Sequence, residues 1–361
     1  MMIPYVEIIR EMEDGSLKVF SFIEPSECWF ELKYHGFGEF ELYCTATRKN
    51  LTALKKGYYV KIPNRRFGWV ITSIQYEFKA ESGVRMISAK GYELKWLLKK
   101  RIIQKPVQLS TNLFQAVHGL VDANIGEGAS EERRIPFFKS VQNSETITIP
   151  DTQAPRGNLG EYVDTLLKAH SCGSTAFFVE GGANTLGIAF GAYKGQNKAN
   201  SVRFSQSFDN LLSSTYFSND ENVGSFALVV SKIDDVDYPM EVDKGSKGSK
   251  RSEILVESNI STEYTPATGG DPIKTEPTSA LYKGWQEEEG KNKLAERTTI
   301  EEVSGEIDLQ NSLFKFDEDF FLGDVVRVQD EYFDFFLDTR IEKATIKQDS
   351  SGYGEEIEYN K

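Results

Sequence analysis

The strongest constraint on this chain is a strand–glycine–strand motif that occurs twice. Near the N-terminus the motif comprises residues 54–62 (LKKGYYVKI) and 68–74 (GWVITSI). Near the C-terminus it comprises residues 321–328 (FLGDVVRV) and 336–341 (FLDTRI). Each copy has a turn glycine, an alternating strand, a polar turn and a second alternating strand. The repetition predicts two related β-units at opposite ends of one chain, and therefore a duplication.

Both copies also continue in the same way. The second strand runs on with alternating residues, strictly at 74–78 in the first copy and less strictly at 341–346 in the second. Each copy then reaches a glycine-bearing turn, at residues 81–83 and 350–352. We therefore expect both copies to show the same strand order. A duplicated β-unit also allows a trimer to present near-sixfold symmetry.

Length and composition extend the β prediction to most of the chain. A chain of 361 residues suggests two to four domains. Aromatic residues make up 12% of it, which favours strands over helices. We expect a mainly β fold with an α+β insertion: two similar β-barrels, an α+β domain and a small fourth module. The expected boundaries are 1–108 for the first β-barrel with a trailing helix, 109–200 for the α+β domain, 201–240 plus 299–361 for the second β-barrel, and 241–298 for a loop-rich helical module.

Helices are expected at four places, where apolar residues recur with helical spacing or a polar cap precedes the run. Thr111 and Asn112 provide the cap of the second helix. The expected helices cover residues 91–101, 111–124, 161–170 and 279–298. A pair of strands at 174–180 and 185–191 should follow the third helix. Residues 243–251 are rich in Gly, Ser and Lys and should form a mobile loop.

Charge and cysteine content argue against several functional classes. The net charge is −13, so the chain lacks the Lys and Arg excess that nucleic-acid binding requires. Three scattered cysteines, Cys28, Cys44 and Cys172, are too few for a disulfide framework or a zinc site. No apolar run approaches the roughly 20 residues of a membrane span, and residues 1–25 lack the apolar core of a signal peptide. We expect no specific nucleic-acid binding and no stable membrane insertion.

The three histidines do not form a catalytic pattern. His118 flanks the apolar face of a helix, and His35 precedes a turn glycine. His170 lies two residues from Cys172, but a nucleophilic Cys needs a His facing it across a site. His170 is better explained as a residue at a helix C-terminus. We therefore expect no His-based metal site, and no cofactor.

Acidic and glycine-rich segments offer no specific site either. The carboxylates at 317–319 and at 330, 331, 334 and 338 lack the spacing of a calcium loop and are predicted to be solvated. A paired-carboxylate glycosidase stays open, because nothing singles out one pair. Glycines 181, 182 and 187 lack the Lys-Ser/Thr ending of a phosphate loop and are predicted to serve a hairpin turn. The prediction is a protein without catalytic, cofactor-binding or metal residues.

Several short segments, taken in order, resemble one known family. They are residues 36–42 (GFGEFEL), 54–57 (LKKG), 91–103 (GYELKWLLKKRII), 157–159 (GNL), 202–205 (VRFS) with 209–211 (DNL), 249–253 (SKRSE) and 321–326 (FLGDVV). Together they resemble the tail-hub proteins of long-tailed phages and prophages, over nearly the whole chain. Each segment alone is weak, and their order makes the resemblance specific.

The resemblance implies a non-enzymatic structural hub. Hubs of this family form a homotrimer at the tail tip, in which two similar barrels per subunit match a sixfold tail tube and distal tail ring. The implied partners are the distal tail protein ring, the tape-measure protein, and a tail fibre or receptor-binding protein. The implied location is the virion tail tip, after synthesis in the bacterial host cytoplasm. The chain ends at Lys361, soon after the second β-unit, so no lysin activity is carried over.

Two alternatives from other functional classes stay open. One is a cell-wall hydrolase acting at the tail tip. The other is a carbohydrate-binding module that recognises the host surface, which the aromatic content would permit. The sequence distinguishes neither the host nor a contractile from a non-contractile tail.

Overall fold

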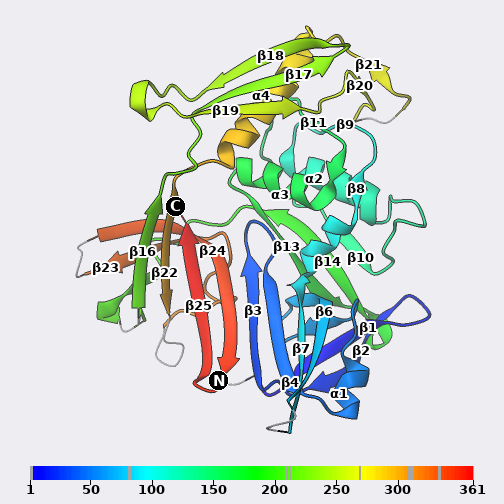
Figure 1. Cartoon of the computed structure of the whole chain (residues 1–361), viewed down its shortest axis with the longest axis vertical. Coiled ribbons are helices and arrows are strands. Elements are labelled where there is room, and N and C mark those ends of the chain that lie inside the picture. Colours follow the sequence, from blue (N-terminus) through cyan, green and yellow to red (C-terminus); the bar gives the residue numbers. More distant parts are fainter. Residues whose placement is uncertain are drawn as a thin grey trace.

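The structure, a computed structural model, describes residues 3–79, 83–208, 210–211, 213–267, 270–306, 313–331 and 335–360. It is mainly β, as expected. Figure 1 shows the strands of the two chain ends side by side in the lower part, and a smaller layer of strands with one helix at the opposite end. In the described part of the chain, no helix has both the length and the apolar character needed to cross a membrane.

The N-terminal strand unit is an antiparallel arrangement whose members pair in the order β2-β1-β5-β6-β7-β4-β3. A short helix, α1 (Arg48–Ala53), connects β4 to β5 and is capped by Thr47. The strands are β1 (Val6–Glu11), β2 (Leu17–Ile23), β3 (Glu27–Lys33), β4 (Glu39–Thr45), β5 (Tyr59–Lys61), β6 (Gly68–Lys79) and β7 (Val84–Glu93).

The C-terminal strand unit pairs in the order β24-β25-β22-β16, with β23 on the first part of β24 and β15 beside β23. Its strands are β15 (Arg203–Ser205), β16 (Ser213–Asn219), β22 (Ile300–Glu306), β23 (Val325–Asp330), β24 (Phe335–Asp349) and β25 (Gly352–Asn360). The expected strand at 299–309 is described up to Glu306, and residues 307–309 lie outside the described residues.

The predicted duplication is confirmed in strand order and in backbone detail. The antiparallel series β5-β6-β7 is matched by β23-β24-β25. Gly57 and Gly323 precede the first strand of each series, with φ of 86° and 84°. Their N–H groups donate to the carbonyls of Ile71 (2.8 Å) and Ile341 (2.7 Å). A β-bulge follows directly in both copies, at residues 71–73 and 341–343.

The two strand units do not form the separate barrels that we expected. Residues Lys343–Gln348 of β24 pair antiparallel with Cys28–Lys33 of β3, which joins both units in one sheet. No barrel closes within the described residues, and the strand order is open at β16. The ladder between β3 and β24 has no local sequence signature, because alternation fixes which face is buried and leaves the pairing partner open.

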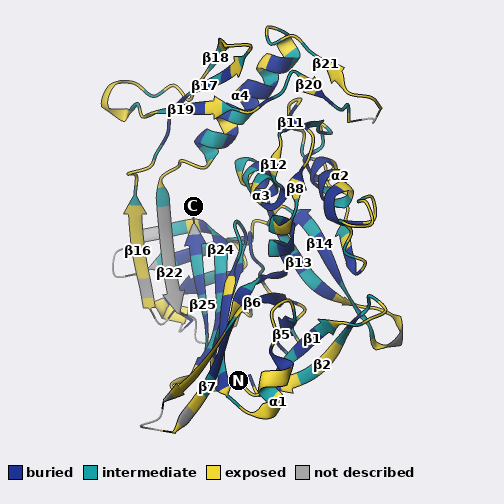
Figure 2. Cartoon of the chain, turned by 45° about the vertical axis from the view of Figure 1, so that its right-hand side comes forward, coloured by how far each residue is buried: buried dark blue, intermediate teal, exposed yellow. Residues whose placement is uncertain are grey.

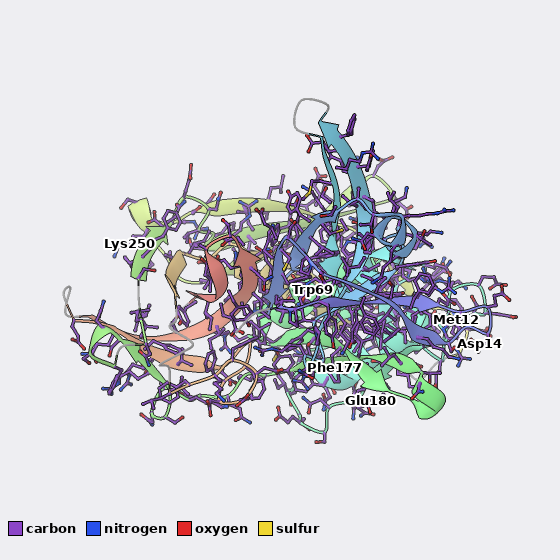
Figure 3. All side chains as sticks on the ribbon, turned by 90° about the horizontal axis from the view of Figure 1, so that it is seen from below. Met12, Asp14, Trp69, Phe177, Glu180 and Lys250 are labelled. Atoms are coloured by element: carbon purple, nitrogen blue, oxygen red, sulfur yellow. The ribbon has the colours of Figure 1, made fainter. Side chains whose placement is uncertain are left out.

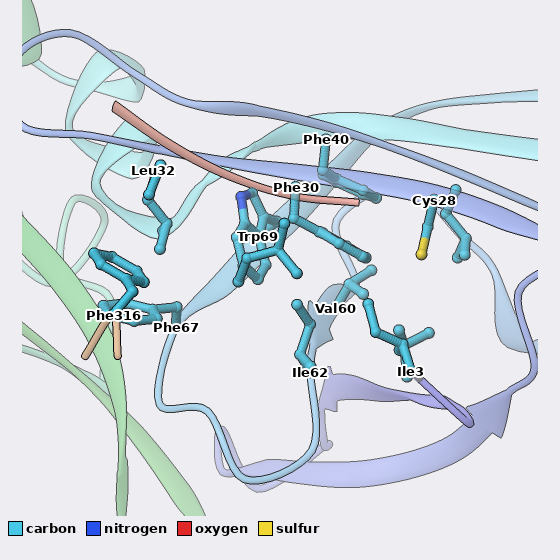
Figure 4. Close-up of a cluster of buried hydrophobic side chains, with 14 of the residues drawn as sticks. Ile3, Cys28, Phe30, Leu32, Phe40, Val60, Ile62, Phe67, Trp69 and Phe316 are labelled. Carbon is cyan, nitrogen blue, oxygen red and sulfur yellow. The ribbon is translucent and has the colours of Figure 1, made fainter. Parts of the chain in front are cut away.

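One hydrophobic core spans both strand units. Figure 4 shows Trp69 of the N-terminal unit beside Phe30, with Phe316 from the C-terminal part of the chain close by. The rings of Phe30 and Trp69 lie 4.8 Å apart, and those of Phe67 and Phe316 lie 6.3 Å apart. Trp69 is fully buried and donates its indole N–H to the carbonyl of Glu31 at 2.8 Å. The two units are therefore packed as one body.

The α+β part packs a second core between two helices and a small sheet. The helices begin at Asn112 and Asn158, whose side chains accept backbone N–H groups and serve as N-caps. The elements are η1 (Leu94–Lys100), β8 (Ile102–Ile103), β9 (Val107–Gln108), α2 (Leu113–Ile125), β10 (Phe138–Val141), β11 (Gln153–Ala154), β12 (Gly157–Asn158), α3 (Leu159–Ala169), β13 (Gly173–Glu180) and β14 (Leu186–Tyr193).

The helix expected at 91–101 is different from the prediction. β7 continues to Glu93, and only residues Leu94–Lys100 are helical, in the 3₁₀ form. Strand pairing explains the change, because Gly91 and Tyr92 are paired with both β4 and β6. The apolar stripe of Leu94, Leu97 and Leu98 is buried as expected.

The remaining segment forms a small layer of its own. Strand β17, expected in the second barrel, instead pairs with β18 and with β19. Helix α4 covers this sheet, lies within the range expected for the fourth helix and is capped by Ser279. The elements are β17 (Phe226–Ile233), β18 (Val236–Asp243), β19 (Glu253–Ser258), β20 (Glu263–Tyr264), β21 (Ile273–Lys274) and α4 (Ala280–Ala295).

The duplicated glycines supply a matched test of the fold. A Cβ at Gly57 would meet no atom within 4 Å, whereas a Cβ at Gly323 would lie 2.2 Å from the ring of Tyr34. Gly57→Ala should cost about 1 kcal/mol through backbone strain alone. Gly323→Ala should cost at least about 2 kcal/mol more, because the ring must move in a packed interior. Thermal and urea unfolding of both variants measures the difference, and equal losses would contradict this packing.

Candidate functional site

The histidines and cysteines are placed as structural residues. Nδ1 of His118 lies 3.0 Å from the Ser140 hydroxyl, and Nε2 of His170 lies 3.3 Å from a carboxylate oxygen of Glu288 on α4. Burial raises the pKa of the Cys172 thiol to about 11, which disfavours the nucleophilic thiolate. His170 therefore bridges α3 to α4, and Cys172 is a buried thiol.

The acidic residues singled out in the sequence are mostly engaged in ion pairs and turns. Asp338 accepts two hydrogen bonds from the Arg327 guanidinium, at 2.6 and 2.9 Å. Asp317 lies 3.6 Å from Arg66, and Asp319 accepts the backbone N–H of Lys315. Asp334 and the side chain of Asp330 lie outside the described part of the chain. Within that part, no three His, Cys, Asp or Glu side chains gather as a metal site would require.

The glycines at 181, 182 and 187, which the sequence assigns to a hairpin turn, lie in the hairpin of β13 and β14. Gly181 and Gly182 connect β13 to β14, and Asn184 has a left-handed φ of 58° in the same turn. Gly187 lies within β14, paired with Val179. The turn interpretation is confirmed, since a phosphate loop would lead from a strand into a helix.

A cleft of about 480 Å³ opens where the three parts of the chain meet. The Arg66 guanidinium lies over the Phe177 ring at 4.7 Å, and Phe67 and Phe321 add apolar lining. The carboxylates in its lining are Glu145 and Asp324. Asp324 is occupied in holding the chain, because it accepts the N–H groups of Gln196 (2.8 Å) and Phe321 (3.0 Å) and lies 3.4 Å from Lys198 Nζ. This geometry favours an architectural role for Asp324 over acid–base chemistry.

The best-built polar site is the junction around Tyr34, which follows β3. Its ring occupies the space left by two glycines: a Cβ at Gly173 or Gly323 would lie 2.3 or 2.2 Å from it. The Tyr34 hydroxyl donates to the Tyr193 carbonyl (3.2 Å) and accepts the N–H of Gly195 (3.1 Å). One side chain thus joins the N-terminal unit to the α+β part and to the turn before β23.

A buried ammonium group stabilises the same junction from the other side. Lys95 of η1 is 1% exposed and donates to the carbonyls of Lys33 (2.5 Å), Tyr34 (3.3 Å) and Ser174 (3.2 Å). Its charge is balanced by Glu93 at 3.2 Å, which also accepts the N–H of Gly38 at 2.9 Å. A buried charge is tolerated only when it is paired and hydrogen-bonded, as here.

The bulge of β24 brings one carboxyl group into this junction. Burial raises the pKa of Glu342 to about 7, against the opposing effect of Arg340, Lys168 and Lys95, while Asp164 adds to the rise. His35 lies 3.8 Å from Glu342, and burial lowers the pKa of this imidazole to about 3. At neutral pH His35 is therefore neutral, and Glu342 is close to half protonated.

These junction residues were not singled out in the sequence. Lys95 had a weak signal, as a charged residue inside the apolar run at 94–98. Tyr34, Glu93 and Glu342 had none, because their neighbours come from distant segments. The expectation of no catalytic, cofactor-binding or metal residues stays a prediction.

The sequence matches one family model from residue 24 to residue 358, that of the Siphovirus ReqiPepy6 Gp37-like protein. The chain belongs to this family. The family resemblance read from the ordered motifs is thus confirmed for a siphovirus tail protein family. Among proteins with curated descriptions, none matches the sequence.

Two solved structures of tail proteins share the fold. The tail protein from Neisseria meningitidis MC58 is 11% identical, with a TM-score of 0.56, and the match covers 99% of this chain and 96% of that one. The 43 kDa tail protein of prophage MuSo2 from Shewanella oneidensis is 12% identical, with a TM-score of 0.53 and coverage of 98% of both chains. At such low identity the likeness concerns the fold alone, and it covers 98–99% of this chain.

Removing the buried ammonium group should strongly destabilise the junction. Lys95→Met leaves the Glu93 carboxylate buried without its partner, which should cost about 3–5 kcal/mol of unfolding free energy. The double variant Lys95→Met/Glu93→Gln should recover part of that loss, because the unpaired charge is gone. Urea unfolding monitored by tryptophan fluorescence measures both. Additive losses in the double variant would contradict a coupled pair.

Glu342 should make stability depend on pH. Its pKa is raised in the folded state, so its contribution is complete below the unfolded value of about 4.5 and is lost as pH rises through 7. Glu342→Gln stays neutral, so this variant should become the more stable protein by about 1–3 kcal/mol near pH 8. Both proteins carry His35, so their difference from pH 5 to 8 isolates Glu342. A difference that does not change with pH would refute the assignment.

Proposed function

We propose that this protein is a structural hub at the tip of a phage or prophage tail. It acts as a homotrimeric adaptor that matches the sixfold tail tube and distal tail ring to a threefold tip. In the resting particle the trimer closes the tube, and on adsorption it opens so that the tape-measure protein and DNA pass. The role is mechanical and needs no enzymatic residue. Its location is the virion tail tip, after synthesis in the bacterial cytoplasm.

The observation that carries this proposal is the duplicated strand unit inside a phage-tail fold. Gly57 and Gly323 mark equivalent turns, and equivalent bulges follow them. Three copies of a chain with two similar units present six similar units around an axis. That arrangement is what a threefold part needs in order to contact a sixfold ring.

The charge of the chain suits a channel through which DNA passes. The net charge of −13 favours a surface that repels phosphates and keeps them from binding. The proposed partners are therefore proteins: the distal tail protein ring above, the tape-measure protein within, and a tail fibre or receptor-binding protein below.

Labelling and counting the protein in whole tails tests the proposal. The connection between β18 and β19, which includes Lys250, is exposed and lies on the opposite side from Met12, Asp14 and Glu180 (Figure 3). An epitope tag inserted after Lys247 should leave the strand units intact. Gold-labelled antibody should then mark the tail tip, and quantitative mass spectrometry of tails should give three copies per particle. A label along the tube, or a different copy number, would contradict the hub.

Peptidoglycan zymography of the purified chain separates the hub from the hydrolase alternative. A hub without hydrolase activity leaves the substrate intact. Lysis that disappears on replacing one carboxylate would overturn the mechanical role. Binding of the isolated chain to whole cells or to a glycan array would instead favour the carbohydrate-binding alternative.

A further inference from the structure

Within the described residues, two strand edges are open, and they correspond to two edges that pair inside the chain. In the C-terminal unit, β23 pairs with the first part of β24 and β3 pairs with the second part. In the N-terminal unit, β5 pairs with the first part of β6, and among the described residues no strand pairs with the second part on that side. β16 likewise ends the strand order, with β22 as its one described neighbour.

The duplication identifies β16 as the equivalent of β3. β3 pairs with β4, and β4 pairs with β7. In the other unit, β16 pairs with β22, and β22 pairs with β25. Since β7 and β25 are equivalent strands, β4 corresponds to β22 and β3 to β16. The open edge of β6 and the open edge of β16 are therefore the equivalents of the edges joined by the β24–β3 ladder.

We propose that β6 of one subunit pairs antiparallel with β16 of a second copy of this chain. The internal ladder supplies the register, because following the pairs through both units equates Thr345 with Gln75 and Glu31 with Phe217. Thr345 pairs with Glu31, so Gln75 pairs with Phe217 of the neighbour. Ile346 pairs with Phe30 inside the chain, and the equivalents of these two residues are Tyr76 and Tyr216. Tyr76 of one copy therefore pairs with Tyr216 of the neighbour.

Side-chain exposure agrees with this register. Ile346 is 1% exposed and Phe30 is fully buried, and both belong to the core that the two joined units share. Their equivalents, Tyr76 and Tyr216, are 51% and 54% exposed. Figure 2 shows exposed residues along β16 and towards the free end of the β6–β7 hairpin. Long aromatic strand edges of this kind are a liability in a monomer and a binding surface in an assembly.

The chemistry of the paired strands fits as well. In this register, residues 73–78 of β6 lie opposite residues 214–219 of β16 in the neighbouring copy. Glu77 is the one charged residue in these two segments. No like charges therefore meet across the ladder. The contact is head-to-tail, so it closes into a ring when the rotation between copies allows it. Only the number of copies, three, rests on the proposed function.

Engineered cysteines test the register in the full-length chain. Gln75→Cys/Phe217→Cys places two thiols opposite each other across the subunit boundary, at the separation of directly paired strand residues. Mild oxidation should give covalent dimers and trimers on non-reducing gels, and the reductant should return them to monomers. The matched control, Gln75→Cys/Ser218→Cys, puts the second thiol on the other face of β16 and should stay monomeric on the gel. The three native cysteines are buried and are present in both variants.

An exposed-residue variant gives a second measurement that does not depend on cross-linking. Tyr216→Asp should abolish the oligomer in light scattering while the far-UV circular dichroism spectrum of the folded chain is retained. Phe22→Asp, at an aromatic residue of similar exposure (48%) on β2, should keep the oligomer. An oligomer that cross-links only in the control variant would overturn this interface and leave the trimeric hub standing. A wild-type chain that is monomeric both in solution and in assembled tails would overturn both.

Discussion

The antiparallel ladder between β3 and β24 is the constraint on which the rest of the molecule depends. It joins strands from opposite ends of the sequence, so the two copies of the duplicated unit form one sheet with one core. Tyr34, directly after β3, extends that contact into the α+β part through its hydroxyl. The ladder and the shared core together fix the angle between the two units. One chain therefore contains, between its two units, the strand pairing that we propose to recur between subunits.

A buried ion pair and a closely packed glycine stabilise the junction where the two units and the α+β part meet. Lys95 holds three carbonyl groups from two parts of the chain, and Glu93 balances its charge in the interior. Gly323 combines a left-handed backbone with close contact to the Tyr34 ring. Gly57, its counterpart, has the backbone conformation without the contact. Gly57 and Gly323 thus share the backbone conformation of the turn. They differ in their surroundings, because only Gly323 packs against the Tyr34 ring.

The sequence was sufficient for the duplication and for three of the four expected helices, whereas the helix expected at 91–101 is partly strand and partly 3₁₀ helix. Gly57 and Gly323 were recognisable because a turn that requires positive φ selects glycine, and the capping residue Asn112 was recognisable because its side chain acts on the next helical turn. Long-range contacts were not predictable in this way. The alternation in β17 fitted the second barrel as well as the separate sheet in which it lies. Tyr34 gave no signal, because its partners become neighbours only in the folded chain.

In the proposed assembly, the internal ladder between β3 and β24 is the template for the contact between subunits. A reconstruction of assembled tails by electron cryomicroscopy, calculated without imposed symmetry, measures this most directly. We expect three copies at the tip, related by threefold symmetry, with β6 of each copy paired antiparallel to β16 of the next and Gln75 opposite Phe217. Three copies that meet through other surfaces, or a tip in which this chain is a single copy, would contradict it.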